Sequence, residues 1–186
     1  MTGAGAAPGG LKRALRRDLR AVRAAAVAGL DAAQRGAAAE AVAEYVRPLL
    51  RAPVGAYAAA GDEIDPAPAA PGAALPWFEH EGPPMRFRLG PPTHQHRFGP
   101  QPGPDAPLVE PMTLLVPLLA CTPAGIRLGQ GGGFYDRYLA ARADRGDMTV
   151  VGCAWDCQVV DDLPTEPHDM ALDWIATPTR LIRCRA

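Results

Sequence analysis

Two helical patterns open the chain. In the first, apolar residues recur every three or four positions, at Leu11, Leu15, Leu19 and Val22. The opposite face of this helix is strongly basic, because it carries Lys12 and five arginines against a single acid, Asp18. Asp31 and Gln34 have the spacing of a capping box, so the alanine-rich stretch from Asp31 to about Leu50 predicts a second helix.

Farther along the chain, short apolar runs lie between breaking residues and predict strands. Buried strands are expected at residues 54–59, 113–119, 148–154 and 173–177, and a half-buried, alternating strand at 85–89. Proline-rich stretches at 66–76 and from about 90 to 111 predict irregular connections. A third helix is expected from Phe134 to Arg145. Strands interleaved with helices predict an α/β fold of three αβα layers, with a mostly parallel, Rossmann-like sheet and N-terminal helices.

Length and composition indicate one folded domain. The 186 residues fit a single domain at 11–186 behind a flexible N-terminus at 1–10, and the 48% of hydrophobic residues is enough for a core. The net charge of −1 disfavours nucleic acid as a partner, since a polyanion attracts an excess of positive charge. The chain shows no signal peptide, no apolar run of membrane-spanning length and no CxxC pair. We therefore expect a monomer in the cytoplasm that binds no membrane.

The most informative segment is RLGQGGGFYDR, from Arg127 to Arg137, between a predicted strand and a predicted helix. Its glycines allow backbone N–H groups to converge, and the start of the next helix adds unpaired donors, an arrangement that suits a phosphate. The segment is neither a Walker A loop nor a GxGxxG fingerprint, so a plain tight loop is the alternative. The cations that a nucleotide needs could come from Arg127, Lys12 and Arg16. Lys12 and Arg16 share a helix face, although a solvated basic surface would look the same.

Acidic residues accompany this segment. Asp136 follows the glycines, and Asp169 lies ahead of the last predicted strand, so the two could hold Mg²⁺ together with phosphate oxygens. Taken singly, each is also a common helix cap or loop former. Asp62, Glu63 and Asp65 follow the end of a predicted strand, where ligand clefts of α/β proteins usually open. One of these three acids could recognise a polar ligand.

Other possible sites have less support. His94 and His96 lie in a proline-rich stretch without a third metal ligand, so we expect a surface loop there. Cys153 and Cys157 lack the further ligands of a zinc site. The chain contains no GxSxG pattern, which disfavours a serine hydrolase.

Four motifs, in this order, resemble the 5-formyltetrahydrofolate cyclo-ligase family, also called 5,10-methenyltetrahydrofolate synthetases. They are KRALR at 12–16, DEID at 62–65, RLGQGGGFYDR at 127–137 and LPTEPHD at 163–169. The resemblance implies an ATP- and Mg²⁺-dependent cyclisation of 5-formyltetrahydrofolate to 5,10-methenyltetrahydrofolate, with release of ADP and phosphate. In the implied mechanism, the formyl oxygen attacks the γ-phosphoryl group, N10 closes on the activated carbon and phosphate leaves. No protein nucleophile is needed, so catalysis would rest on positioning and charge neutralisation.

The resemblance also implies roles for individual residues. The ATP-binding residues that it implies are Lys12, Arg13, Ala14, Leu15, Arg16, Arg127, Leu128, Gly129, Gln130, Gly131, Gly132, Gly133, Phe134 and Tyr135. Among these, Arg127 and Tyr135 are expected to be catalytic. Asp136 and Asp169 would bind Mg²⁺. Glu63 would accept hydrogen bonds from the pterin, and Ala58 would line the same pocket.

Two features depart from the family's pattern. Relatives usually carry a helix between the DEID acids and a following strand that contains a Leu-Pro pair, whereas here only residues 66–75 intervene, too few for a usual parallel crossover. Relatives often have a Phe-Asp pair ahead of the glycine-rich motif, where this chain has CTPAGI at 121–126. The short segment motivates an alternative, a related nucleotide-binding or regulatory module without folate chemistry. RNA binding through the basic helix is a third interpretation, which predicts steeply salt-dependent affinity.

Overall fold

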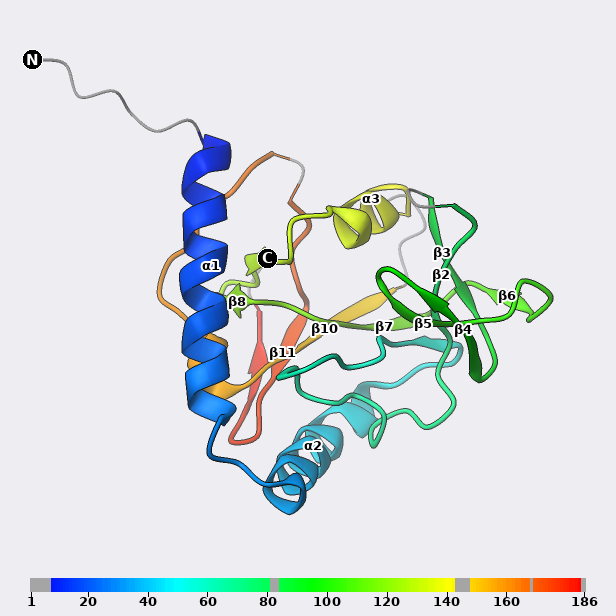
Figure 1. Cartoon of the computed structure of the whole chain (residues 1–186), viewed down its shortest axis with the longest axis horizontal. Helices are drawn as coiled ribbons and strands as arrows, with labels where there is room; N and C mark the ends of the chain where they lie inside the picture. The colour runs from blue at the N-terminus through cyan, green and yellow to red at the C-terminus, as the bar shows by residue number, and fades with distance from the viewer. Residues whose placement is uncertain (1–7, 81–83, 143–147, 168, 185–186) are drawn as a thin grey trace, which may run out of the picture.

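A helix-flanked sheet forms the centre of the structure (Figure 1), a computed structural model that describes residues 8–80, 84–142, 148–167 and 169–184. In spatial order, the sheet contains β1 (Val54–Gly55), β7 (Thr113–Val116), β10 (Thr149–Cys153), β11 (Trp174–Ala176) and β12 (Leu181–Arg183). The pairings from β1 to β11 are parallel, and β12 runs antiparallel to β11. The predicted α/β class with a mostly parallel sheet is confirmed.

Both faces of this sheet are buried, because successive side chains of a strand point to opposite faces. Leu115 and Val151, which pair across β7 and β10, lie in one apolar cluster with α2 (Ala32–Val46). Leu114 and Val150 lie in the cluster on the other face. That face is covered by α3 (Phe134–Ala140) and by a smaller antiparallel sheet, whose residues belong to the same cluster. Burial on both sides explains why β7 reads as an uninterrupted apolar run.

The smaller sheet consists of β2 (Leu75–Phe78), β3 (Met85–Arg88) and β6 (Leu108–Val109). A bridge between Gly55 and Ala74 links the start of β2 to the main sheet. Since β2 is not itself a parallel strand of the main sheet, its connection to β1 needs no crossover helix. The connection contains turns, as the prolines predict, up to Ala74. The short segment after the DEID acids is therefore compatible with the fold.

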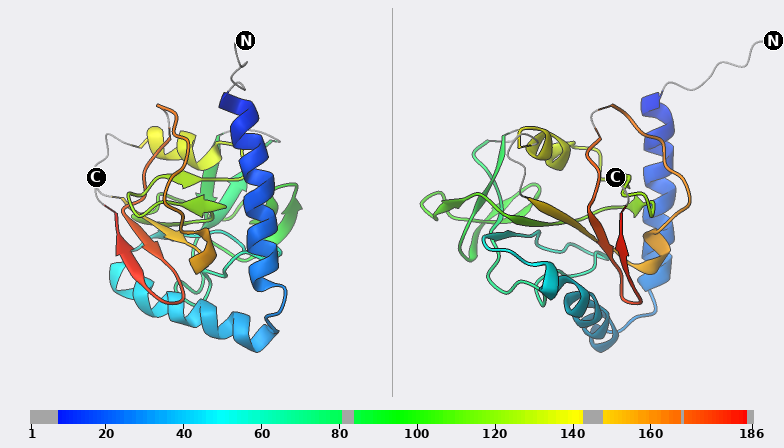
Figure 2. Two further views of the ribbon diagram at one scale, coloured as in Figure 1. Left: turned by 90° about the vertical axis from the view of Figure 1, so that its left-hand side faces the viewer. Right: turned by 180° about the vertical axis from the view of Figure 1, so that it is seen from behind.

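Helix α1 (Pro8–Val27) lies along one edge of the molecule in Figure 1 and in the right view of Figure 2, and it faces the viewer in the left view of Figure 2. Leu15 and Leu19 pack against β8 (Ala120–Cys121) and β9 (Arg127–Leu128), which form a short antiparallel hairpin. The predicted N-terminal helix is confirmed and begins three residues earlier than its periodicity predicts. Residues 1–7 of the predicted flexible start lie outside the described residues, and the predicted domain limits stay a prediction.

The second predicted helix is confirmed together with its capping box. The Asp31 carboxylate accepts the Gln34 backbone N–H, and the Gln34 side chain accepts the Asp31 N–H. The helix ends at Val46, and Arg47–Leu49 continues as a 3₁₀ turn (η1). The prediction that it reaches Leu50 is wrong, because Pro48 has no N–H with which to continue the α-helical ladder.

Several other predicted boundaries are also wrong. The strand expected at 54–59 ends at Gly55, and the strand expected at 113–119 ends at Val116, directly before Pro117. Helix α3 (Phe134–Ala140) is shorter than expected, and residues 143–145 of that prediction lie outside the described part of the chain. Proline cannot donate to a strand ladder, which explains the early end of β7.

Part of the predicted loop between residues 90 and 111 is a hairpin instead. It is formed by β4 (Pro92–His96) and β5 (Gly99–Pro102), which pair antiparallel. Edge strands tolerate proline because one side of the strand needs no donor. The sequence signal for these strands is therefore weak, and β12 was not predicted either.

Two further expectations concern the layers of the fold and membrane-spanning helices. The Rossmann-like, three-layer description stays a prediction, since one face of the main sheet is covered in part by a second sheet. Within the described ranges, no helix combines the length and the apolar character needed to cross a bilayer.

Candidate active site

A cavity of about 760 Å³ collects most of the residues singled out from the sequence. It is lined by α1, by the segment after β1, by the β4–β5 hairpin, by the glycine-rich segment and by the segment before β11. A volume of this size fits a cofactor or a small-molecule substrate. Ala58 and Glu63 are brought together here with Lys12, Arg16 and residues 127–137. Asp169 of the fourth motif lines the cavity as well, so the four motif regions meet in one place although they are far apart in the sequence.

The glycine-rich segment turns its carbonyl groups toward arginines. Arg16 donates to the Gly129 carbonyl (2.9 Å), and Arg137 donates to the Gly132 carbonyl (2.7 Å). In a trans peptide the C=O and the following N–H point in opposite directions, so the amides of Gln130 and Gly133 face away from these arginines. Within the described residues, the N–H groups of 130–133 donate to no protein acceptor. They remain available to an anion.

The positive φ angles of two glycines shape this segment. Gly131 has φ of +106° and Gly133 has φ of +63°, a region that L side chains rarely adopt. Gly133 also occupies the N-cap position of α3. The glycines are therefore needed for the backbone conformation itself.

Lys12 is buried and held by two carboxylates. Its ammonium lies 2.9 Å from Asp169 Oδ2 and 3.0 Å from Glu166 Oε2. Burial lowers the pKa of Lys12, but the hydrogen bonds to Asp169 and Glu166 and their charges outweigh it, so the pKa lies above its usual value. Lys12 is therefore charged at neutral pH.

Arg127 and Asp136 form a second buried ion pair on the cavity wall. The Arg127 guanidinium donates to Asp136 Oδ1 at 2.6 Å, and the Met170 N–H reaches the same oxygen at 3.3 Å. The segment that carries Asp169 thus docks on the start of α3. The Arg127 Nε is buried without a partner in the described part of the protein. Buried N–H groups usually have an acceptor, which makes this atom a candidate contact for a bound anion.

Tyr135 lies beside this pair, with its ring 5.9 Å from the Arg127 guanidinium. Burial raises the pKa of Tyr135 well above its usual value, and the nearby charge of Glu63 adds to the rise. The phenol therefore keeps its proton at neutral pH and can donate a hydrogen bond.

Glu63 lies on the cavity wall next to the glycine-rich segment, where Gln130 Nε2 donates to its Oε1 at 3.5 Å, and it is held by α1. Its Oε2 accepts the Ala60 N–H at 3.1 Å, and Oε1 lies 3.8 Å from the Arg23 guanidinium. Arg23 also donates to Asp62 Oδ1 at 2.6 Å. The sequence analysis did not single out Arg23, although its spacing places it on the same helix face as Lys12 and Arg16.

An aromatic cluster that the sequence analysis missed forms another wall. The ring of Phe98 lies 4.5 Å from that of Phe134 and 5.0 Å from that of Phe78, and His96 stacks on Phe78 at 5.2 Å. Phe98 and the hairpin that carries it line the cavity. The prediction of a loop at His94 and His96 is therefore wrong, because both lie in β4, whereas His94 is exposed as expected and His96 is half-buried against Phe78.

Some implied residues do not reach the cavity. Arg13 and Ala14 are exposed on α1, and Leu15 packs in the cluster of Leu128. Their implied roles in ATP binding stay predictions. Leu128 is buried and lines the cavity.

The proposed metal ligands, Asp136 and Asp169, both line the cavity. Each carboxylate already pairs with a cation, Asp136 with Arg127 and Asp169 with Lys12. Among the described residues, no three or more His, Cys, Asp and Glu side chains are grouped as a metal site would require. The roles of the two aspartates at Mg²⁺ stay predictions.

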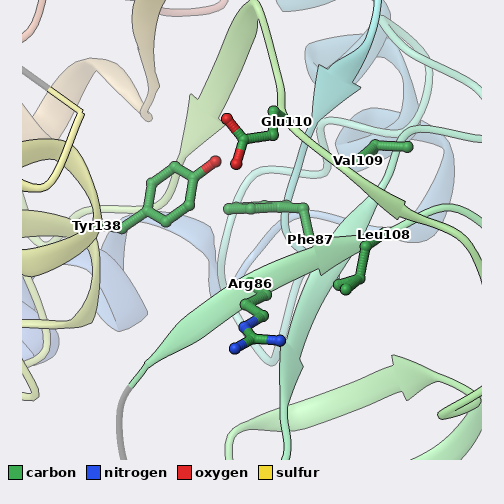
Figure 3. A pocket seen from close by; sticks show the side chains of 6 residues that line it. All are labelled: Arg86, Phe87, Leu108, Val109, Glu110 and Tyr138. Atoms are coloured by element: carbon green, nitrogen blue, oxygen red, sulfur yellow. The ribbon is translucent and has the colours of Figure 1, made fainter. Parts of the chain in front are cut away.

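Another cavity, of about 300 Å³, lies apart from these residues (Figure 3). It is lined by Arg86, Phe87, Leu108, Val109, Glu110 and Tyr138. These side chains come from β3, β6, α3 and the segment after β6, and they include no residue predicted for the site.

Comparisons with known proteins agree with the motifs. Residues 92–178 match the model of the 5-formyltetrahydrofolate cyclo-ligase family. The 5-formyltetrahydrofolate cyclo-ligase of Mycolicibacterium smegmatis is 43% identical over 67 residues, 36% of this chain and 34% of that protein. The Escherichia coli protein of the same name is 43% identical over 75 residues, 40% of this chain and 41% of that protein.

The likeness in fold extends much farther than the likeness in sequence. The solved structure of the 5,10-methenyltetrahydrofolate synthetase of Aquifex aeolicus matches with a TM-score of 0.74 and 26% identity, over 95% of this chain and 94% of that one. The matched part of the chain spans 34% and 41% of the length of the two curated relatives above. The chain thus resembles the 5-formyltetrahydrofolate cyclo-ligase family in sequence over residues 92–178 and in fold over nearly its whole length, as its motifs predict.

Proposed function

We propose that this chain catalyses the ATP- and Mg²⁺-dependent cyclisation of 5-formyltetrahydrofolate to 5,10-methenyltetrahydrofolate, with release of ADP and phosphate. The observation that carries the proposal is the meeting of the glycine-rich segment, Lys12 and Glu63 in one cavity. The names of the relatives supply the reaction, and the cavity supplies groups of suitable chemistry for both of its substrates.

The phosphate chain of ATP would lie against the glycine-rich segment. The amide N–H groups of 130–133 have no protein acceptor in the described residues, and the buried Nε of Arg127 has no acceptor there either. Lys12 and Arg16 add positive charge to the same wall. Backbone amides and cations of this kind are the usual ligands of phosphate oxygens. The donor set therefore fits a nucleotide.

Asp136 and Asp169 would hold Mg²⁺ at this phosphate chain. Their carboxylate oxygens are ligands of the type that Mg²⁺ prefers, together with water and phosphate oxygens. When bound, the ion would neutralise charge on the transferring phosphoryl group. Each aspartate would exchange part of its present ion pair for that contact.

The folate would occupy the side of the cavity that Glu63 and Ala58 line. The Glu63 carboxylate would accept hydrogen bonds from pterin N–H groups, and its position is fixed by the Ala60 N–H. The protonated Tyr135 phenol would donate to an oxygen near the reacting centre. These residues would hold the formyl oxygen in line with the γ-phosphoryl group, after which N10 closes the ring and phosphate leaves. The chain itself would form no covalent bond to substrate.

The proposal includes a monomeric, cytoplasmic enzyme that binds neither nucleic acid nor membrane. Negligible RNA affinity at moderate salt and a single species of monomer size in solution are the expected results. Salt-dependent RNA binding would instead favour a role for the basic face of α1.

The reaction is tested by following methenyltetrahydrofolate absorbance after mixing the protein with 5-formyltetrahydrofolate, ATP and Mg²⁺. Omission of any one of the three should abolish the signal. Binding of ATP by a folded sample that forms no product would favour the alternative, a nucleotide-binding or regulatory module without folate chemistry.

Two variants separate the proposed roles. Glu63→Ala should lose folate affinity and keep ATP affinity, and unchanged folate affinity would remove Glu63 from the site. Asp136→Asn should raise the Mg²⁺ concentration needed for activity, and an unaltered Mg²⁺ requirement would remove Asp136. Glu40→Gln is the matched control for both, because Glu40 is an exposed, ion-paired carboxylate on α2 away from the cavity.

A further inference from the structure

Glu63 lies at the end of a tight turn that begins at Ala60. The Glu63 N–H donates to the Ala60 carbonyl at 3.2 Å, and the Ala60 N–H donates back to Glu63 Oε2 at 3.1 Å. Gly61 has φ of +62°, which allows the backbone to turn this sharply. These bonds fix the carboxylate relative to its own turn, but they do not tie the turn to the rest of the protein.

Two buried aromatic side chains tie this turn to the core. The Tyr57 O–H donates to the Ile64 carbonyl at 2.6 Å. The Trp155 indole N–H donates to the Asp62 carbonyl at 2.9 Å. The two carbonyls belong to the residues directly before and after Glu63. The backbone that carries Glu63 is therefore held on both sides by donors from outside the turn.

The two aromatic donors are themselves fixed by the fold. Tyr57 and Trp155 are buried in the apolar cluster that contains residues of α2. Tyr57 follows β1 and Trp155 follows β10, two strands that run in the same direction in the main sheet. Burial raises the pKa of the Tyr57 phenol well above its usual value, so its O–H remains a donor at neutral pH.

From this geometry we infer that Tyr57 is a positioning residue for Glu63, which it acts on by holding the Ile64 carbonyl. A carboxylate that is already held in place loses less freedom when the pterin N–H groups bind to it, so folate affinity is higher. The inference rests on the folate-binding role proposed for Glu63. It adds a residue to which the motifs assign no role.

Tyr57→Phe tests the inference, because phenylalanine keeps the ring and removes only the hydroxyl group. The dissociation constants of 5-formyltetrahydrofolate and of ATP are each measured by calorimetric titration. The constant for the folate is expected to rise about five-fold, as for the loss of one hydrogen bond, and that for ATP to stay at the wild-type value. An equal rise for both ligands would indicate a general structural effect and would overturn the inference.

Tyr45→Phe is the matched control. The Tyr45 O–H also donates to a backbone carbonyl, that of Thr179, at 3.2 Å, but from the α2 helix and away from the cavity. Its removal should leave both dissociation constants at their wild-type values. A five-fold loss of folate affinity in Tyr45→Phe as well would remove the special role of Tyr57.

A double-mutant cycle separates positioning from direct contact, since Tyr57 also lines the cavity. If Tyr57 acts through Glu63, its replacement should matter much less in a Glu63→Gln background, where the positioned carboxylate is gone. We expect the five-fold effect to fall below about two-fold there. An effect that persists in full would show that Tyr57 acts independently of Glu63 and would overturn the inference.

Failure of the proposed function looks different. If the wild type does not bind 5-formyltetrahydrofolate, or if Glu63→Ala binds it as tightly as the wild type does, the folate site is wrong and the inference fails with it. If Glu63→Ala loses folate affinity and Tyr57→Phe keeps it, only the inference fails.

Discussion

Arg23 joins α1 to the acidic segment after β1, and its replacement by methionine tests how much this contact stabilises the fold. Methionine keeps an unbranched apolar stem and removes the guanidinium. Arg23 is 5% exposed and pairs with Asp62 at 2.6 Å and with Glu63 at 3.8 Å. The variant leaves two partly buried carboxylates without their cation.

The magnitude follows from the burial of these partners. Removing one member of a buried ion pair costs ~3–5 kcal/mol. The Asp62 and Glu63 side chains are 23% and 13% exposed, so water partly solvates the carboxylates. The cost of removing Arg23 is therefore expected at or below the lower limit of this range. We expect a loss of about 2–3 kcal/mol in the free energy of unfolding. Arg47→Met breaks an ion pair of 2.8 Å with Glu40, but both side chains are about half exposed, so its cost is expected below ~0.5 kcal/mol.

Equilibrium unfolding in urea measures both variants against the wild type. With a slope of about 2 kcal/mol/M, the midpoint for Arg23→Met should fall by about 1–1.5 M and that for Arg47→Met by at most ~0.25 M. Equal midpoints for the two variants would refute the reasoning, because burial would then make no difference to the value of the contact.

Three further predictions concern backbone conformation, thiols and pH. Gly36→Ala should stabilise the protein by up to about 1 kcal/mol, since alanine favours the helix α2 and an added Cβ meets no atom within 4 Å. Gly133→Ala should destabilise the protein by about 1–2 kcal/mol, because residue 133 has a φ of +63°, so the urea midpoint should rise for the first variant and fall for the second. Burial raises the pKa of the Cys121 and Cys153 thiols to about 12. Iodoacetamide at pH 8 should therefore label these thiols far more slowly in the native protein than in urea, as measured by mass spectrometry. Equal labelling rates in the two conditions would contradict their burial. Because the pKa of Lys12 is raised above 10.5, its ion pairs contribute fully below that pH and are lost as pH rises through the folded value. The stability gap between the wild type and Lys12→Met should therefore stay constant from about pH 7 to 9 and shrink above about pH 10.5, and a gap that shrinks already near pH 8 would contradict the raised pKa.

Elements with strong local signals were predictable from the sequence. The capping box of Asp31 and Gln34 and the periodic apolar residues of α1 depend on neighbours in the sequence, and both are confirmed. The apolar runs of β7 and β10 were found because both faces of these strands are buried. The glycine-rich segment could also be singled out, because its signal is local: its backbone conformation needs glycine at 131 and 133.

Features that depend on tertiary contact were not predictable. The β4–β5 hairpin contains prolines and little apolar periodicity, and it is defined by the packing of Phe98 on Phe78 and Phe134. Arg23 and Glu166 are ordinary surface-type residues in the sequence, and only the fold places each beside its charged partners. In each case the decisive partner is more than ten positions away along the chain.

The most direct test of the proposed reaction is its stoichiometry. Purified protein is mixed with 5-formyltetrahydrofolate, ATP and Mg²⁺, and the methenyltetrahydrofolate formed and the phosphate released are measured in the same samples over time. The proposed cyclo-ligase should release phosphate and form product in equal amounts, and each should cease when folate or ATP is omitted. Phosphate release that proceeds without folate, or a folded and ATP-binding sample that forms no product, would contradict the proposal.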